Sequence, residues 1–163
     1  MSRKLVFLDT ETTGLDTVND ELVELTYVSD SMYRPRTLYF GVESVHSFID
    51  SLIKFTERGI AGKKSHKYDI NNFLEATEGA TLVAANPAFD AAFLKNNDLW
   101  SFHYRMLDIE TYAMAKLGLD QVPSMHDIYQ TLVGMGYDIT EPDHTSLNDV
   151  LALQQSFHIL EKM

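Results

Sequence analysis

Two pentapeptides in this chain place an aspartate and a glutamate two positions apart, LDTET at residues 8–12 and LDIET at residues 107–111. Each follows an apolar run that indicates a β-strand, and side chains two apart on a strand point to the same face. If the first strand continues through Glu11, the carboxylates of Asp9 and Glu11 therefore meet at one point. Carboxylates are the ligands that hard cations such as Mg²⁺ prefer, although a solvated strand end would also explain the pair.

The second pentapeptide has a different context, because the helix-forming segment YAMAKLG follows it and Gly118 is a suitable end for that helix. An aspartate between a strand and a helix accepts hydrogen bonds from the free N–H groups at the helix start. Glu110 adds negative charge near the positive end of the helix dipole. We therefore predict that Asp108 caps a helix and that the first pentapeptide alone supplies reactive carboxylates.

Two later segments contain further acids beside predicted helix starts. NPAFD places Asn86 as an N-cap, Pro87 at the first helical position and Asp90 in the first turn. Near the C-terminus, DHTSLND holds His144 and Asp149 ahead of an amphipathic helix. Each acid also has a plain structural explanation as a dipole-favoured or solvated helix residue, and His144 has one as a loop histidine.

The spacing of His144 and Asp149 limits how the two residues could share a site. On one regular helix, five steps of about 100° each would place their side chains about 140° apart. We therefore expect the helix to begin near His144 and to leave this side chain on a mobile lead-in. A mobile histidine could complete a site when substrate arrives and accept a proton near neutral pH.

Taken in order, the segments DTETTGL, NPAFD and HTSLND resemble the three exonuclease motifs of the DEDD superfamily. The histidine five residues before the last aspartate resembles the DEDDh branch, which includes bacterial proofreading exonucleases and their small relatives. This resemblance implies a general base at His144 and four acids that bind metal. The four acids are Asp9, Glu11, Asp90 and Asp149, of which Asp9 would bridge two ions.

The same resemblance implies a cofactor of two divalent cations, Mg²⁺ or Mn²⁺, which would stabilise charge during phosphodiester hydrolysis. It implies a 3′–5′ exonuclease that acts on single-stranded nucleic acid, with DNA favoured, and releases 5′-mononucleotides. An oligoribonuclease or RNA-trimming enzyme is the alternative within this class, and a catalytically idle nucleic-acid-binding domain of the same fold is the alternative outside it. Expected partners are 3′ ends of DNA or RNA and a polymerase or other replication or repair protein.

Substrate contacts are also implied by the resemblance, with backbone near the first motif holding the terminal nucleotide and Leu15 wedged beside a base. Phe89 and Phe93 could stack on bases or line the pocket, and core packing is the structural alternative for both. The substrate-binding candidates are Thr10, Thr12, Thr13, Gly14, Leu15, Asn86, Phe89 and Phe93. The basic stretch at residues 58–67 could contact phosphates or be a solvated loop.

Two positions depart from the pattern of the family that the motifs resemble. Family members often have histidine where this chain has Ala85, and many have alanine where it has Ser146. Neither change replaces a reacting group, so we expect an effect on rate or substrate preference rather than a loss of activity.

The elements that must position these residues follow from hydrophobic periodicity. Strands are expected at residues 4–9, 21–29, 36–42, 81–85 and 105–109, and helices at 45–55, 70–76, 87–95, 110–117, 124–134 and 145–162. Three strands in an antiparallel meander followed by alternating helices and strands predict an α/β fold, with a mixed sheet flanked by helices. By resemblance the fold is ribonuclease-H-like.

Composition narrows the class of protein further. A length of 163 residues predicts a single domain at 1–163, and no apolar run approaches the length that crosses a bilayer. The absence of cysteine fits a cytoplasmic location and excludes thiol nucleophiles and cysteine zinc sites. The net charge of −11 argues against long electrostatic tracking along nucleic acid, so substrate must be held locally.

Overall fold

The computed structural model describes residues 3–163 and contains one mixed sheet of five strands. The strands are β1 (Leu5–Thr12), β2 (Leu22–Val28), β3 (Arg36–Tyr39), β4 (Thr81–Ala84) and β5 (Leu107–Asp108). Their order across the sheet is β3-β2-β1-β4-β5. The first three strands form the predicted antiparallel meander, and β4 and β5 continue the sheet in parallel with β1.

Within residues 3–163, six helices accompany this sheet. They are α1 (Ser47–Ile53), α2 (Lys67–Thr77), α3 (Pro87–Asn96), α4 (Ile109–Leu117), α5 (Met125–Gly134) and α6 (Ser146–Glu161). All six predicted helices are confirmed, and their ends coincide with the predicted ones or shift by up to three residues. None of the helices in residues 3–163 combines the length and the hydropathy that a membrane span requires.

Three predicted elements are shorter than expected by three residues or more. The third strand stops before Gly41, whose φ of 80° breaks the extended backbone. The first helix ends at Lys54, which adopts a left-handed conformation with φ of 55°. The fifth strand begins at Leu107 and ends at Asp108, where Asp108 becomes the N-cap of the next helix.

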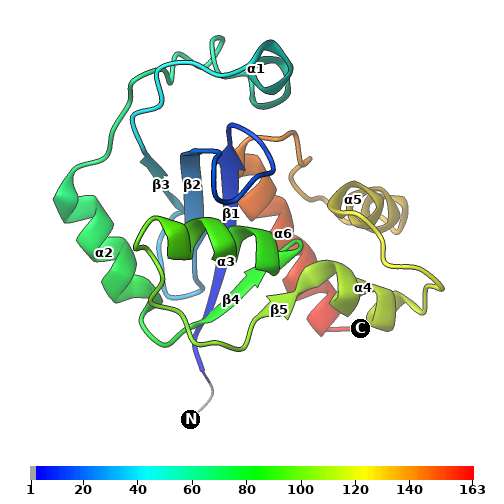
Figure 1. Ribbon diagram of the computed structural model, residues 1–163. Helices are drawn as coiled ribbons and strands as arrows, with labels where there is room; N and C mark the ends of the chain where they lie inside the picture. The colour runs from blue at the N-terminus through cyan, green and yellow to red at the C-terminus, as the bar shows by residue number, and fades with distance from the viewer. Residues whose placement is uncertain (1–2) are drawn as a thin grey trace.

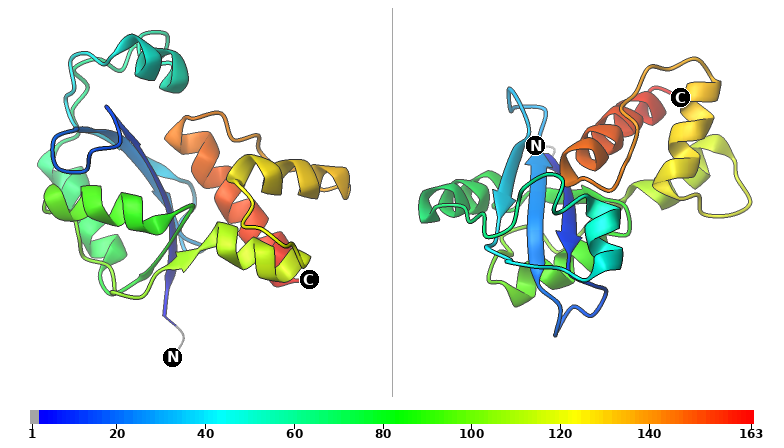
Figure 2. Two further views of the ribbon diagram at one scale, coloured as in Figure 1. Left: turned by 45° about the vertical axis from the view of Figure 1, so that its right-hand side comes forward. Right: turned by 90° about the horizontal axis from the view of Figure 1, so that it is seen from above.

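The sheet lies between two groups of helices, with α2 and α3 on one face and α4, α5 and α6 on the other (Figures 1 and 2). Alternation along β1 explains this layering, because Val6 and Leu8 join one hydrophobic cluster with Phe73 and Phe93, whereas Phe7 joins the other with Phe157. Both faces of β1 are therefore buried. The resulting three-layer α/β arrangement confirms the predicted fold class.

Helix α1 and the turn after it pack separately, over the end of the sheet where β1 finishes and β2 begins (Figure 1). Ile53, Phe55 and Ile60 form a small buried cluster with Val23 and Val42. This packing brings the start of the basic stretch at residues 58–67 against strand β2 rather than leaving it in solvent.

Candidate active site

Three of the predicted metal-binding acids converge in the structure. One carboxylate oxygen from each of Asp9, Glu11 and Asp149 lies within 4.8 Å of the other two. Asp9 and Glu11 share a face because β1 continues through Thr12, which fulfils the condition set by the sequence. Asp149 reaches them from the first turn of α6, which packs across β1 and β2.

The fourth acid lies beside this group rather than within it. Asp90, in the first turn of α3, is 3% exposed, and its Oδ1 accepts a hydrogen bond of 2.7 Å from the Thr10 hydroxyl. Thr10 lies between Asp9 and Glu11 in β1, so its side chain points to the opposite face of the strand. The Asp90 carboxylate is nonetheless close enough to Asp9 to repel its charge.

Burial and mutual repulsion make it unfavourable for all four carboxylates of this site to be ionised at once. Burial first, and then the charges of Glu11 and Asp149, hold the pKa of Asp9 well above its usual range. Burial, and then the charges of Asp149 and Glu24, raise the pKa of Glu11 to about 9. Burial raises the pKa of Asp90 to about 7 and also raises the pKa of Asp149. The site therefore favours bound protons or bound cations at neutral pH.

One oxygen of this site has no hydrogen-bond partner among residues 3–163. Asp9 Oδ2 is buried and accepts no hydrogen bond from protein. A buried carboxylate oxygen without a donor is costly unless a cation or a proton satisfies it. Together with an all-oxygen donor set, this atom fits a hard divalent cation such as Mg²⁺ or Mn²⁺.

His144 lies outside helix α6, as its spacing from Asp149 requires. Its side chain is exposed, its φ is 59°, and the helix begins two residues later at Ser146. Asp143 N–H donates to Asp149 Oδ1 over 2.9 Å and Thr145 Oγ1 donates to Asp143 Oδ1 over 2.6 Å, so hydrogen bonds tie the chain on both sides of His144.

The turn after β1 presents the predicted wedge to solvent. Leu15 is 84% exposed, as a side chain that contacts substrate must be. Below it the turn is internally bonded, with Thr12 Oγ1 donating to Gly14 O over 2.6 Å and the Thr13 hydroxyl accepting from Glu21 N–H over 2.9 Å. The side chains of Thr12 and Thr13 therefore shape the turn.

The two aromatic candidates on α3 have different environments. Phe93 is completely buried in the core cluster of the α2 and α3 face, so the prediction that it stacks on a base is wrong for this structure. Phe89 is only partly buried and packs against it with 5.0 Å between ring centroids. A base could reach Phe89 alone. The predicted N-cap Asn86 is exposed and left-handed, with no side-chain cap bond.

The capping role predicted for Asp108 is confirmed. Its Oδ1 accepts from Glu110 N–H over 3.1 Å, and Gly118 ends the same helix in a left-handed conformation. The same oxygen also accepts from Asn86 N–H over 3.3 Å, which joins the turn before α3 to the start of α4. Asp108 is thus separate from the carboxylate group around Asp9.

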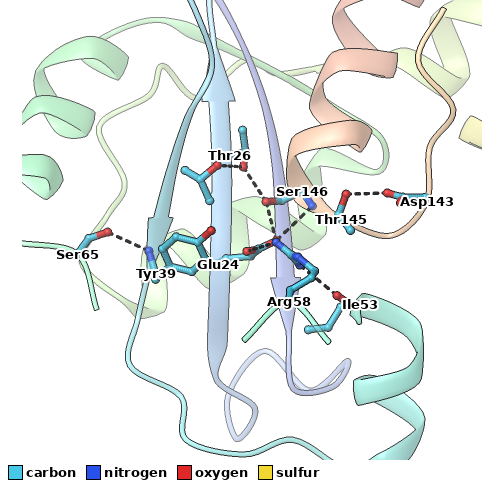
Figure 3. Close-up of polar contacts among 10 residues, drawn as sticks. Glu24, Thr26, Tyr39, Ile53, Arg58, Ser65, Asp143, Thr145 and Ser146 are labelled. Atoms are coloured by element: carbon cyan, nitrogen blue, oxygen red, sulfur yellow. Dashed lines mark hydrogen bonds and ion pairs between the residues drawn. The ribbon is translucent and has the colours of Figure 1, made fainter. Parts of the chain in front are cut away.

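Sequence reasoning missed one buried charge next to the site. Glu24 is fully buried on β2 directly opposite Glu11, and Arg58 Nη2 donates to both of its carboxylate oxygens over 2.9 and 2.8 Å (Figure 3). The available signal was a glutamate within the apolar run ELVELTYV, which simple alternation assigns to solvent. Arg58, the first residue of the basic stretch, is thereby engaged in an ion pair with Glu24, with its side chain 22% exposed.

The two departures from the family pattern also have defined environments. Ser146 is completely buried, and its hydroxyl bonds to Glu24 Oε1 over 2.9 Å and to Thr26 Oγ1 over 2.7 Å (Figure 3). Ala85 is partly buried and packs against the cluster on the α4, α5 and α6 face. Of the two, only Ser146 introduces a polar group, and it does so at the start of the helix that carries Asp149.

Comparison of the sequence with known proteins identifies a family and a relative. A family model described as Exonuclease, RNase_T, matches residues 6–157. A DNA polymerase III subunit epsilon-like protein of Rhodobacter capsulatus is 30% identical over 178 residues, which cover 94% of this chain and 23% of that protein. The chain thus spans about a quarter of the length of this relative.

Solved structures with the same fold include two exonucleases. Exonuclease I from Methylocaldum szegediense superposes with a TM-score of 0.69 at 17% identity, covering 99% of this chain and 41% of that one. Exonuclease X in complex with 5′-overhanging duplex DNA superposes with a TM-score of 0.68 at 19% identity, covering 97% of this chain and 91% of that one. At these identities the likeness concerns the fold.

Proposed function

The chain belongs to the RNase_T exonuclease family, and from that premise we propose that it is a metal-dependent 3′–5′ exonuclease of the DEDDh type. Membership of this family supports a nuclease activity, and we propose the direction of cleavage, the substrate and the products. The substrate is single-stranded DNA, and the products are 5′-mononucleotides.

The observation that carries this proposal is the convergence of Asp9, Glu11 and Asp149 with Asp9 Oδ2 buried and unpaired. These three acids, with Asp90 beside them, would hold divalent cations. When bound, such cations supply charge stabilisation for the attacking and leaving oxygens of a phosphodiester. The pattern of raised carboxyl pKa values supports the same role, because a cation removes the repulsion that raises them.

His144 is proposed as the general base. Its imidazole is exposed and close enough to Asp149 for the two charges to interact, and the N–H of the preceding residue, Asp143, donates to Asp149 Oδ1. An exposed imidazole in this place can accept the proton of the attacking water and release it to solvent. Leu15 and Phe89 are the apolar side chains that remain accessible for the terminal nucleotide.

DNA is favoured over RNA by the relatives, among which are a DNA polymerase III subunit epsilon-like protein and an exonuclease X bound to duplex DNA. The first of these also supports a polymerase or repair protein as partner. The net charge of −11 supports local capture of a chain end over binding along a duplex.

A labelled-oligonucleotide assay tests the proposal. Matched DNA and RNA single strands, labelled at the 5′ end or at the 3′ end, are incubated with the protein in Mg²⁺, in Mn²⁺ and in excess chelator. We expect a 5′-labelled DNA ladder that shortens stepwise, early release of a labelled mononucleotide from 3′-labelled DNA, and no cleavage in chelator. Faster cleavage of RNA would indicate the oligoribonuclease alternative. Binding without cleavage under every metal condition would indicate an idle domain.

A further inference from the structure

The buried carboxylate of Glu24 joins three parts of the chain that lie far apart in sequence. Arg58 donates to it from the turn after α1, and Ser146 donates to Glu24 Oε1 through its hydroxyl over 2.9 Å and its N–H over 3.3 Å. All three residues meet on one face of β2 (Figure 3). A buried charge is retained at low cost only when it is paired and fully hydrogen-bonded, as this one is.

Glu24 also takes the place of a missing cap at the start of α6. The N-cap residue Thr145 makes no side-chain cap bond, and its hydroxyl donates to Asp143. The first N–H groups of a helix need acceptors and favour negative charge. Glu24 accepts the Ser146 N–H from the neighbouring strand, so a residue of the sheet caps the helix.

The register between β1 and β2 places the residues that cap α6 opposite the residues of the carboxylate group. Glu24 lies directly opposite Glu11, and Thr26, which bonds to the Ser146 hydroxyl, lies directly opposite Asp9. The two β2 residues that hold the first turn of α6 are therefore the strand partners of the two β1 residues that converge with Asp149. Three positions along that helix separate Ser146 from Asp149.

A second ion pair fixes the same helix start from the other side. Lys54 Nζ lies 2.6 Å from Asp143 Oδ2, and Asp143 N–H donates to Asp149 Oδ1 over 2.9 Å. Lys54 and Arg58 belong to one turn, because Arg58 N–H donates to Lys54 O over 2.8 Å. The turn after α1 thus contacts the lead-in of α6 directly, through Asp143, and its first turn indirectly, through Glu24.

We propose that Arg58, Glu24 and Ser146 form a positioning network that sets the place of Asp149 relative to Asp9 and Glu11, and thereby the affinity of the site for divalent cations. This inference rests on the proposed metal-dependent function. The three residues are positioning residues and touch no substrate. The serine, which stands where many family members have alanine, strengthens the link between α6 and β2 in this chain.

Two serines of helix α6 provide a matched test. Ser146 and Ser156 are both completely buried, but the Ser156 hydroxyl has no hydrogen-bond partner among residues 3–163. Calorimetric titration of the purified full chain with Mn²⁺ measures affinity without relying on activity. We expect Ser146→Ala to weaken Mn²⁺ binding by roughly 10-fold or more, as loss of a residue that orients metal ligands commonly does. Ser156→Ala should bind Mn²⁺ as the wild type does.

Kinetics separates positioning from a general loss of structure. In the Ser146→Ala variant, kcat at low Mn²⁺ should fall, saturating Mn²⁺ should restore it, and KM for a labelled oligonucleotide should stay unchanged. Arg58→Lys keeps the charge beside Glu24 and should retain most of the Mn²⁺ affinity, whereas Arg58→Met should lose it. Melting curves in chelator establish which variants are folded, and the serine pair decides the question if Arg58→Met does not fold.

The outcomes distinguish this inference from the function on which it rests. Folded Ser146→Ala protein with wild-type Mn²⁺ affinity would overturn the positioning network and leave the exonuclease proposal intact. Equal weakening in both serine variants would also overturn it, because any buried hydroxyl of α6 would then matter alike. A wild-type chain that binds neither Mn²⁺ nor Mg²⁺ would instead overturn the metal-dependent function itself.

Discussion

Replacement of Glu11 by glutamine should change the stability of the metal-free protein in a direction that depends on pH. Burial and the neighbouring charges of Asp149 and Glu24 raise the pKa of Glu11 from 4.5 to about 9. The folded state therefore binds a proton that the unfolded state has released throughout this interval. Stability from this group is fully present below about pH 4.5 and is lost as the pH rises toward 9.

The size of the effect follows from proton linkage. Each pH unit within the interval removes about 1.4 kcal/mol from the free energy of unfolding for one such group. Glutamine carries no charge at any of these pH values and keeps the shape of the side chain. We therefore expect the metal-free Glu11→Gln variant to be more stable than the wild type by roughly 3–5 kcal/mol at about pH 8 and by less than about 1 kcal/mol at about pH 5.

Melting curves in chelator measure this difference at both pH values. For a domain of this size, about 1 kcal/mol corresponds to roughly 2–4 °C, so the variant should melt about 10 °C higher at the upper pH. Added Mg²⁺ should narrow the difference at the upper pH, because it stabilises the wild type by binding and the variant lacks one ligand. The control is Glu21→Gln, the same change at an exposed glutamate just before β2.

A difference between Glu11→Gln and wild type that is the same at both pH values would refute the electrostatic reasoning. Such a result would mean that the Glu11 carboxylate is compensated within the protein itself. A comparable pH-dependent gain in Glu21→Gln would mean that overall negative charge, rather than the buried group, governs stability.

Three further variants address individual roles. Asp9→Asn should reduce nuclease activity by several orders of magnitude. Asp108→Asn, at the matching position of the second pentapeptide, should cost no more than about 1 kcal/mol of stability and keep most activity, because asparagine caps helices well. Equal losses of activity in the two folded variants would place Asp108 in the active site. His144→Ala should lower kcat by roughly 10²–10⁴-fold with Mn²⁺ affinity retained, and the opposite pattern by calorimetry would make His144 structural. Leu15→Ala should raise KM for a single-stranded oligonucleotide without changing the melting temperature, since its side chain is 84% exposed, and an unchanged KM would remove it from the substrate site.

The local features of this protein were determined by its sequence. Alternation along β1 places Asp9 and Glu11 on one face, and the strand–helix junction makes Asp108 a cap. The spacing of His144 and Asp149 excludes a common helix, and α6 indeed begins after His144. These features could be predicted because each depends on backbone geometry or hydrogen bonds within about five residues.

Tertiary structure alone decided the contacts between distant segments. Phe93 lies in the core and Phe89 at its edge, although both lie on the same face of one helix, because the packing of α3 on the sheet decides how far along the helix that face is covered. Glu24 pairs with Arg58 across 34 positions and with Ser146 across 122. No periodicity encodes such distances, since their formation depends on how whole elements pack. The pairing of Asp9 and Glu11 could therefore be predicted from the sequence. The network proposed to hold Asp149 beside them forms only when β2, the turn after α1 and α6 pack together.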